Sequence, residues 1–250
     1  MALQEKLEAQ GSWLFRHRGI LPIFVLMPCA LLYARTELVP GAFALEDTPY
    51  EFYYEMFAVL VSLAGAAIRA IAVGHTPANT SGRNTRGQVA DELNVSGMYS
   101  MLRHPLYLGN FLMWLGVALW TGEPWFIGMF CLAFWLYYER IMFAEEQFLR
   151  RKFGAAFEEW AARTPAFFPD LRLFRRSAYP FSWKKCLRKE KTGLLALFLI
   201  FFAFDLFGML VEQDGHYNLW IWIAFALSLA AYAAAKILNK YTGSLKDGRG

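Results

Sequence analysis

Residues 105–143 decide the fold, and they read PLYLGNFLMWLGVALWTGEPWFIGMFCLAFWLYYERIMF. Two apolar stretches, 105–120 and 125–143, are separated in this run only by the turn sequence Thr121-Gly122-Glu123-Pro124. A helix that crosses a bilayer needs about 20 mostly apolar residues, because its backbone groups find no water to bond in lipid. The two stretches and the short turn therefore predict an antiparallel hairpin of membrane helices.

Composition extends this prediction to the whole chain. Hydrophobic residues make up 57% of the 250 residues and charged residues only 18%, against roughly 25% charged in soluble domains. This composition leaves too little polar surface for a soluble protein, and it excludes disordered, fibrous and disulfide-scaffold chains. We expect an all-α polytopic integral membrane protein, one membrane domain over 1–250, with about six transmembrane helices at 19–34, 52–73, 105–120, 125–143, 194–211 and 219–238.

The distribution of charge predicts the orientation. The loops 35–51, 121–124 and 212–218 hold seven acidic residues and one basic residue, Arg35, whereas the other 24 of the 25 Lys and Arg side chains lie elsewhere. Basic residues concentrate on the cytoplasmic side of membrane proteins. Both termini are therefore predicted to be cytoplasmic, as in a bacterial inner membrane protein, although an endoplasmic reticulum protein would obey the same rule.

Two long inner segments, 74–103 and 139–191, are polar enough to hold a site that faces the cytosol. Residues 145–162 are predicted to form an amphipathic cytosolic helix that ends at Thr164-Pro165. Residues 171–191 alternate basic and apolar side chains, which favours a segment lying along an anionic membrane surface. A role of this segment in substrate recognition is the alternative.

The block GMYSMLRHPLYLGN at residues 97–110 carries the strongest local signal. Arg103 and His104 stand directly before Pro105, and proline favours the first turn of a helix. A cation and an imidazole are therefore predicted at the cytosolic mouth of a membrane helix, whose N-terminus itself favours anions. The alternative is an interfacial anchor that binds no ligand.

Two carboxylates follow at the inner end of the second hairpin helix, Glu145 and Glu146. Because the hairpin is short and antiparallel, we expect them to lie near Arg103 and His104. Carboxylates at the edge of the apolar layer are costly unless they are paired or used. The cluster is therefore either an ion pair that clamps the hairpin or a mixed pocket for a zwitterion.

These blocks form an ordered pattern over residues 97–169, with G-x-Y-x-x-x-R-H-P-x-Y-x-G at 97–109, E-E-x-x-L-x-x-x-F-G at 145–154 and T-P-x-F-x-P at 164–169. The pattern resembles the membrane-embedded methyltransferases related to isoprenylcysteine carboxyl methyltransferase and phospholipid methyltransferases. The resemblance implies S-adenosylmethionine as the cofactor and a central catalytic role for Arg103 and Glu146. It also implies a cofactor pocket built from Tyr99, Arg103, His104, Tyr107, Glu145 and Glu146.

The acceptor is predicted from the polar loop 74–88. Its sequence TSGRNT, together with RHPLYLGN, resembles bacterial relatives that methylate a phosphate of lipid A, while the two helices after Lys191 depart from the shorter prenylcysteine and phospholipid enzymes. A membrane lipid phosphate is our first choice, with a prenylcysteine carboxylate or a phospholipid amine as alternatives. An anionic oxygen needs cations and no base, whereas an amine must lose a proton. The candidate substrate-binding residues are Arg69, His75, Arg83 and Arg86.

Two interpretations from other classes stay open. One is a hairpin like that of sterol reductases, which bind NADPH, although the chain is short for it. The other is a non-catalytic scaffold or lipid-binding protein in which Arg103 and Glu145 only clamp the hairpin. No metal site is expected from the isolated cysteines Cys29, Cys131 and Cys186, and the bilayer and a lipid substrate are the expected partners, with no nucleic acid and no obligate protein partner.

Overall fold

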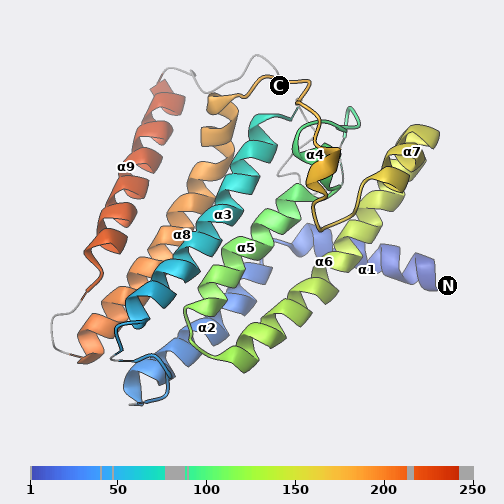
Figure 1. The fold of residues 1–250 in the computed structure, drawn as a ribbon. Coiled ribbons are helices and arrows are strands. Elements are labelled where there is room, and N and C mark those ends of the chain that lie inside the picture. Colours follow the sequence, from blue (N-terminus) through green and yellow to red (C-terminus); the bar gives the residue numbers. More distant parts are fainter. Residues whose placement is uncertain are drawn as a thin grey trace.

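The computed structural model describes residues 2–39, 41–46, 48–76, 88, 90–212 and 217–241. In this part of the chain the protein is all-α (Figure 1), with one isolated β-bridge between Gly97 and Arg175. The elements are α1 Leu3–His17, α2 Leu21–Leu38, α3 Glu51–Gly74, α4 Met98–Met101, α5 Pro105–Leu119, α6 Pro124–Phe153, α7 Ala155–Arg163, the 3₁₀ helix η1 Leu171–Leu173, α8 Trp183–Glu212 and α9 Leu219–Tyr241.

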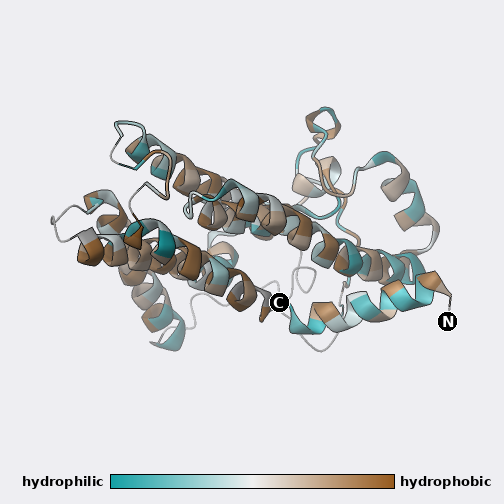
Figure 2. Cartoon of the chain, turned by 90° about the horizontal axis from the view of Figure 1, so that it is seen from below, coloured by the Kyte–Doolittle hydropathy of each residue, from teal (hydrophilic) through white to brown (hydrophobic). Residues whose placement is uncertain are grey.

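Four helices of the described chain, α3, α6, α8 and α9, are long and apolar enough to cross a membrane, and α5 is a shorter apolar helix. Large apolar side chains cover their outer faces. Leu132 on α6 is 67% exposed and Leu227 on α9 is 65% exposed. Figure 2 shows hydrophobic residues along the long helices and hydrophilic residues concentrated on α1 near the N-terminus. Because water does not tolerate so large an apolar surface, lipid is the matching solvent, and the protein is a polytopic membrane protein.

The predicted hairpin is confirmed. Helices α5 and α6 are antiparallel neighbours (Figure 1), and the turn between them includes Gly122, whose φ of +67° suits glycine. The aromatic ring of Phe43 lies where a Cβ at this glycine would stand. Helix α6 extends to Phe153, well past the predicted end at residue 143.

One sequence prediction about the inner segments is wrong. Residues 145–162 do not form one amphipathic helix, because residues up to Phe153 continue α6 and Gly154, with φ +55°, separates them from α7. Within the predicted surface segment 171–191, residues 183–191 form the first turns of α8. The sequence analysis also did not anticipate α1, which packs along α6.

Small residues allow α3 to pack closely against α5. A Cβ at Gly116 of α5 would stand 2.1 Å from Ser62 Oγ and 2.2 Å from Ala58 O of α3. A Cβ at Gly65 of α3 would stand 2.5 Å from Gly109 O. Helices in lipid associate through this kind of close backbone contact, and it brings Arg69 of α3 and Asn110 of α5 together.

Candidate functional site

Arg103 and His104 lie in the link between α4 and α5. Residues 165 and 166 hydrogen-bond to the backbone of this link. The N–H of Arg103 donates to Pro165 O at 2.9 Å, and the N–H of His104 donates to Ala166 O at 3.1 Å. Further along, the N–H of Asp170 donates to Met101 O at 3.1 Å. The T-P-x-F-x-P block therefore serves as a backbone partner for the Arg-His block.

The side chains of these two residues meet the carboxylates of α6, as the hairpin predicted. Arg103 Nε donates to Glu146 Oε1 at 2.8 Å. The His104 ring lies between two carboxylates, with Nε2 3.0 Å from Glu146 Oε1 and Nδ1 3.5 Å from Glu145 Oε2. The predicted proximity of the two hairpin ends is thus confirmed.

His104 is buried, and its charge depends on this pair of carboxylates. Burial lowers the pKa of the imidazole, but hydrogen bonds and charge attraction from Glu145 and Glu146 raise it by more, so the net pKa is above its ordinary value. The ring of Tyr107 stacks on the imidazole with ring centroids 5.5 Å apart. A charged imidazole that donates to Glu146 and lies close to the carboxylate of Glu145 is the state that this geometry favours.

Arg103 also ties α6 to the end of α7. Its Nη1 donates to Ala161 O at 2.9 Å and to Thr164 O at 2.6 Å. Carbonyls at the C-terminus of a helix lack intrahelical partners and carry partial negative charge, so a guanidinium is a suitable ligand for them. Much of the hydrogen-bonding capacity of Arg103 therefore serves to hold α6, α7 and the Arg-His link together.

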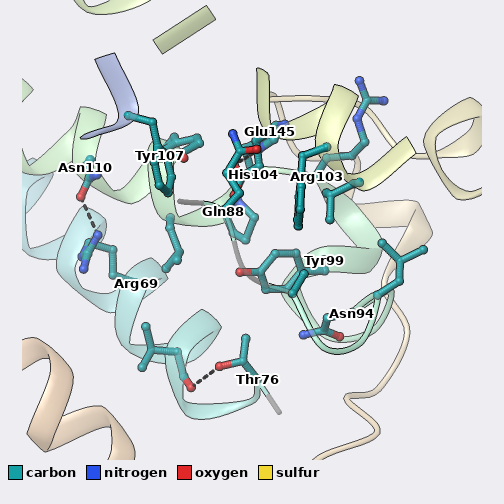
Figure 3. A pocket seen from close by; sticks show the side chains of 18 of the residues that line it. Arg69, Thr76, Gln88, Asn94, Tyr99, Arg103, His104, Tyr107, Asn110 and Glu145 are labelled. Carbon is teal, nitrogen blue, oxygen red and sulfur yellow. Dashed lines mark hydrogen bonds and ion pairs between the residues drawn. The ribbon is translucent and has the colours of Figure 1, made fainter. Parts of the chain in front are cut away.

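An open cavity of about 210 Å³ adjoins this network (Figure 3). Glu145 lines the cavity, whereas Glu146 is not among the described lining residues and lies behind His104 and Arg103. Figure 3 shows the ring of Tyr99 extending into the space between Arg69 and the Arg103–His104 pair. Five of the six predicted cofactor-pocket residues therefore share one cavity, namely Tyr99, Arg103, His104, Tyr107 and Glu145.

The opposite wall of the cavity comes from α3, α5 and α8. Arg69 Nη1 donates to Asn110 Oδ1 at 2.6 Å, and its Nε and Nη2 each donate to one carboxylate oxygen of Glu190 at 2.8 Å. Lys185 of α8 donates to Thr76 O at 2.8 Å. The first turns of α8 are thus fastened to α3 and close this side of the site.

The four candidate substrate-binding residues lie in different places relative to the cavity. Arg69 lines the cavity, but Glu190 and Asn110 engage its guanidinium. His75 follows α3 with Nδ1 2.8 Å from Tyr179 O, and it is not among the described residues of the cavity wall. Arg83 and Arg86 lie outside the described residues.

Several lining residues escaped the sequence analysis. They are Phe15, Arg18, Thr76, Gln88, Asn94, Asn110, Phe148, Trp160 and Glu190. Thr76 and Gln88 belong to the predicted acceptor loop 74–88, and Asn110 ends the block 97–110, so their segments carried a signal although the residues were not named. Glu190 is the one carboxylate in the basic run KKCLRKEK at 184–191.

The wall residues fit a zwitterionic nucleoside such as S-adenosylmethionine. In the described part of the chain, Gln88 Nε2 and Asn94 Nδ2 are buried at the cavity without a hydrogen-bond partner. Such donors suit the oxygen and nitrogen acceptors of a polar ligand. The carboxylate of Glu145 suits an ammonium or ribose hydroxyls, and aromatic rings suit adenine or a sulfonium. Within the described residues, no group of three or more His, Cys, Asp or Glu side chains could hold a metal ion.

Comparison with known proteins shows which family the segment around this cavity resembles. Residues 55–156 match the family model described as phospholipid methyltransferase, so the similarity begins on α3, before the Arg-His block. The chain is therefore a membrane protein with a phospholipid-methyltransferase-like segment.

Individual relatives carry two kinds of name. The chain is 43% identical to the nickel-cobalt-cadmium resistance protein NccN of Alcaligenes xylosoxydans xylosoxydans over 36% of this chain and 41% of that protein. It is 36% identical to the cobalt-zinc-cadmium resistance protein CzcN of Cupriavidus metallidurans over 48% of this chain and 57% of that protein. A probable protein-S-isoprenylcysteine O-methyltransferase of Oryza sativa is 28% identical over 56% of this chain and 74% of that protein.

The chain thus spans about half the length of the two metal-resistance proteins. No solved structure matches the chain. The family model and the isoprenylcysteine methyltransferase name support the methyltransferase resemblance, whereas the two metal-resistance names do not bear on it. The predicted likeness to lipid A phosphate methyltransferases is unsupported.

Proposed function

We propose that the protein is an S-adenosylmethionine-dependent methyltransferase that acts on a membrane lipid. One observation carries the proposal. Arg103, His104, Glu145 and Glu146 form a charge network at the wall of an open, aromatic-lined cavity, within the segment that matches the phospholipid methyltransferase model. Cation and carboxylate side by side are what a zwitterionic cofactor requires.

In this proposal the residues divide into two roles. Tyr99, His104, Tyr107 and Glu145 contact the cofactor directly, together with the exposed part of the Arg103 guanidinium. Glu146 is a positioning residue that acts through Arg103 and His104, since it bonds both of them from behind. This assignment refines the sequence prediction, in which Glu146 shared the cofactor contact and a catalytic role with Arg103.

When bound, S-adenosylmethionine supplies a methyl carbon that its sulfonium has already activated. The residues of this chain then have to align the acceptor with that carbon and keep water out. Aromatic side chains such as Tyr107 and Trp160 form a low-dielectric wall for this purpose. A phosphate or carboxylate acceptor is already deprotonated near neutral pH, so no general base is needed.

We keep a lipid phosphate, first of all that of lipid A, as the proposed acceptor. The sequence supports this acceptor, because residues 74–88 contain two cations, Arg83 and Arg86. Arg69 supports it less, since Glu190 already neutralises its charge. A prenylcysteine carboxylate is the second candidate, because a relative covering 56% of this chain is named for that reaction. From the charge distribution we propose that the site faces the cytoplasm. Our proposed membrane is a bacterial inner membrane, with the endoplasmic reticulum as the alternative that the same charge rule allows.

Methyl incorporation tests the activity and the acceptor together. Purified protein would receive labelled S-adenosylmethionine and, in separate reactions, lipid A, a farnesylcysteine analogue or phosphatidylethanolamine. We expect label in lipid A, abolished by Glu145→Gln and unaffected by Arg151→Gln at an exposed ion pair. Label only in farnesylcysteine or phosphatidylethanolamine would overturn the acceptor, and no label in any lipid would overturn the activity.

A scaffold without catalysis is the second candidate function, and the bonds of Arg103 favour it. This guanidinium holds one carboxylate and two backbone carbonyls, which is what a structural clamp would do. We expect Arg103→Ala and Glu146→Ala to abolish binding of S-adenosylmethionine in protein that stays folded. If they lower only the thermal stability and leave cofactor affinity unchanged, the scaffold is correct. Binding of NADPH in place of S-adenosylmethionine would instead support a reductase.

A further inference from the structure

A second cavity, of about 540 Å³, lies between α7, η1 and the chain around the β-bridge. Trp160 and Leu93 line both cavities, so the second one shares a wall with the candidate cofactor site. Nothing in the methyl-transfer proposal uses it, and the inference below does not depend on that proposal.

The frame of this second cavity is fixed by backbone contacts. Gly97 N–H donates to Arg175 O at 3.0 Å, and Arg175 N–H donates to Ser100 Oγ at 2.9 Å. On the other side, Trp160 Nε1 donates to Tyr99 O at 3.1 Å. The backbone of Arg175 is therefore held in place while its side chain is exposed to solvent.

Charge in the cavity is strongly unbalanced. Three guanidinium groups line it, those of Arg163, Arg172 and Arg175, against one carboxylate, that of Glu159. Arg172 lies 3.4 Å from Asp170 Oδ1. The side chains of Arg163 and Arg175 form neither a hydrogen bond nor an ion pair with any residue that the structure describes. Arginines gathered around one space repel one another, and an anion relieves that repulsion.

The rim of the cavity identifies the kind of anion. Phe174 lines the cavity and is 60% exposed, and the nearby Leu171 and Phe168 are each 73% exposed. Exposed apolar side chains beside arginines match the boundary between lipid headgroups and acyl chains. We infer that this cavity binds the phosphate of an anionic phospholipid, with Arg163 and Arg175 as its ligands.

Bidentate guanidinium–phosphate pairing is the chemistry that would recognise the headgroup. Because Trp160 belongs to both walls and bonds Tyr99, a bound lipid would also brace the cofactor cavity. We therefore expect anionic lipid to stabilise the part of the protein that surrounds the two cavities.

The test uses the full chain in a non-ionic detergent and measures its Tm during titration with short-chain phosphatidylglycerol, short-chain phosphatidylcholine or inorganic phosphate. We expect phosphatidylglycerol alone to raise the Tm. The double variant Arg163→Gln/Arg175→Gln should bind it at least roughly tenfold more weakly, as for the loss of charge-assisted contacts. Arg176→Gln, the matched control on a neighbouring exposed arginine outside the cavity lining, should behave as the parent.

Other outcomes overturn the inference in different ways. An equal Tm shift with inorganic phosphate would assign the cavity to a soluble anion instead of a lipid. Equal shifts with phosphatidylcholine, or an unchanged response in the double variant, would remove the site. The double variant Arg163→Lys/Arg175→Lys covers the case in which the glutamine variant does not fold, because it keeps both charges and loses only the planar guanidinium groups. It should bind phosphatidylglycerol with intermediate affinity. Parental affinity would contradict recognition of the phosphate by guanidinium groups.

Discussion

The two ends of α3 both place charged side chains against neighbouring helices, but they balance the charge differently. At one end, Arg69 meets Glu190 of α8 in a two-bonded ion pair and also donates to Asn110. At the other end, Glu55 accepts from Asn218 Nδ2 at 2.8 Å, and the same amide nitrogen donates to Asp205 of α8 at 2.9 Å. Trp222 Nε1 donates to Asp205 at 2.6 Å.

The first end pairs opposite charges and lines the 210 Å³ cavity, while at the second end the carboxylates share neutral donors. In the described chain, no Lys or Arg forms an ion pair with Glu55 or Asp205. We therefore expect carboxylates matched with cations at a cavity wall, and not every buried or partly buried carboxylate, to form the functional site of this protein. The following variants test that distinction.

Glu146→Ala should have the largest effect. It leaves Arg103 and His104 largely buried without their shared carboxylate, and we expect a loss of about 3 kcal/mol in the free energy of unfolding, near the lower end for broken buried pairs. Thermal or denaturant unfolding in detergent measures it. Glu145→Ala is the matched control; its carboxylate is more exposed and lies 3.5 Å from His104, so it should also lose cofactor affinity but cost less stability than Glu146→Ala. Equal destabilisation by both variants would contradict the division of roles.

Glutamine substitutions at the two ends of α3 should change the free energy of unfolding differently. Glu190→Gln breaks the ion pair with Arg69 and should cost about 1–2 kcal/mol. Glu55→Gln replaces a carboxyl group that has no cationic partner among the described residues, and its amide oxygen still accepts from Asn218, so the change should be neutral or stabilise by up to about 1 kcal/mol. Unfolding of the two variants side by side checks this. If Glu55→Gln lowers the free energy of unfolding as much as Glu190→Gln does, the proposed difference between the two ends of α3 is wrong.

Stability should also decline with pH through His104. Its folded-state pKa is raised by Glu145 and Glu146, against an ordinary value of about 6.5 in the unfolded chain. The stabilisation is therefore fully present below that value and is lost as the pH rises through the folded-state pKa. The Tm difference between the parent and His104→Gln should shrink as the pH rises above about 6.5. A difference that grows with pH would show that the neutral imidazole is the bound form.

Arg151→Gln should have the smallest effect. Arg151 pairs with Glu8 of α1 at 2.6 Å, but its side chain is 60% exposed. Exposed ion pairs contribute little, so we expect less than about 0.5 kcal/mol. A larger loss in the same unfolding assay would mean that the α1–α6 contact depends on this pair.

The sequence predicted the parts of the site that local geometry determines. A four-residue turn forces the ends of the 105–143 hairpin together, and this is why Glu145 and Glu146 were expected beside Arg103 and His104. The break at Gly154 was missed, because apolar periodicity continues across it while the backbone takes a positive φ.

Contacts between residues far apart in the chain could not be predicted from the sequence. Glu190 and Arg69 are 121 residues apart, and no periodicity signals that α8 starts early enough to bring them together. The carbonyls of Ala161 and Thr164 that hold Arg103 are backbone groups, which carry no sequence signature at all. Side-chain pairing across a tight turn is predictable, whereas pairing through the packing of distant helices is not.

Binding of S-adenosylmethionine to the purified protein is the most direct measurement. Calorimetric titration should give saturable binding to the parent, a loss of at least roughly tenfold in affinity for Glu145→Gln, as for one charge-assisted contact, and parental affinity for Glu55→Gln at the opposite end of α3. If the parent binds no S-adenosylmethionine, or if Glu145→Gln binds it as tightly as the parent, the cavity beside Arg103 and His104 is not the methyl-donor site.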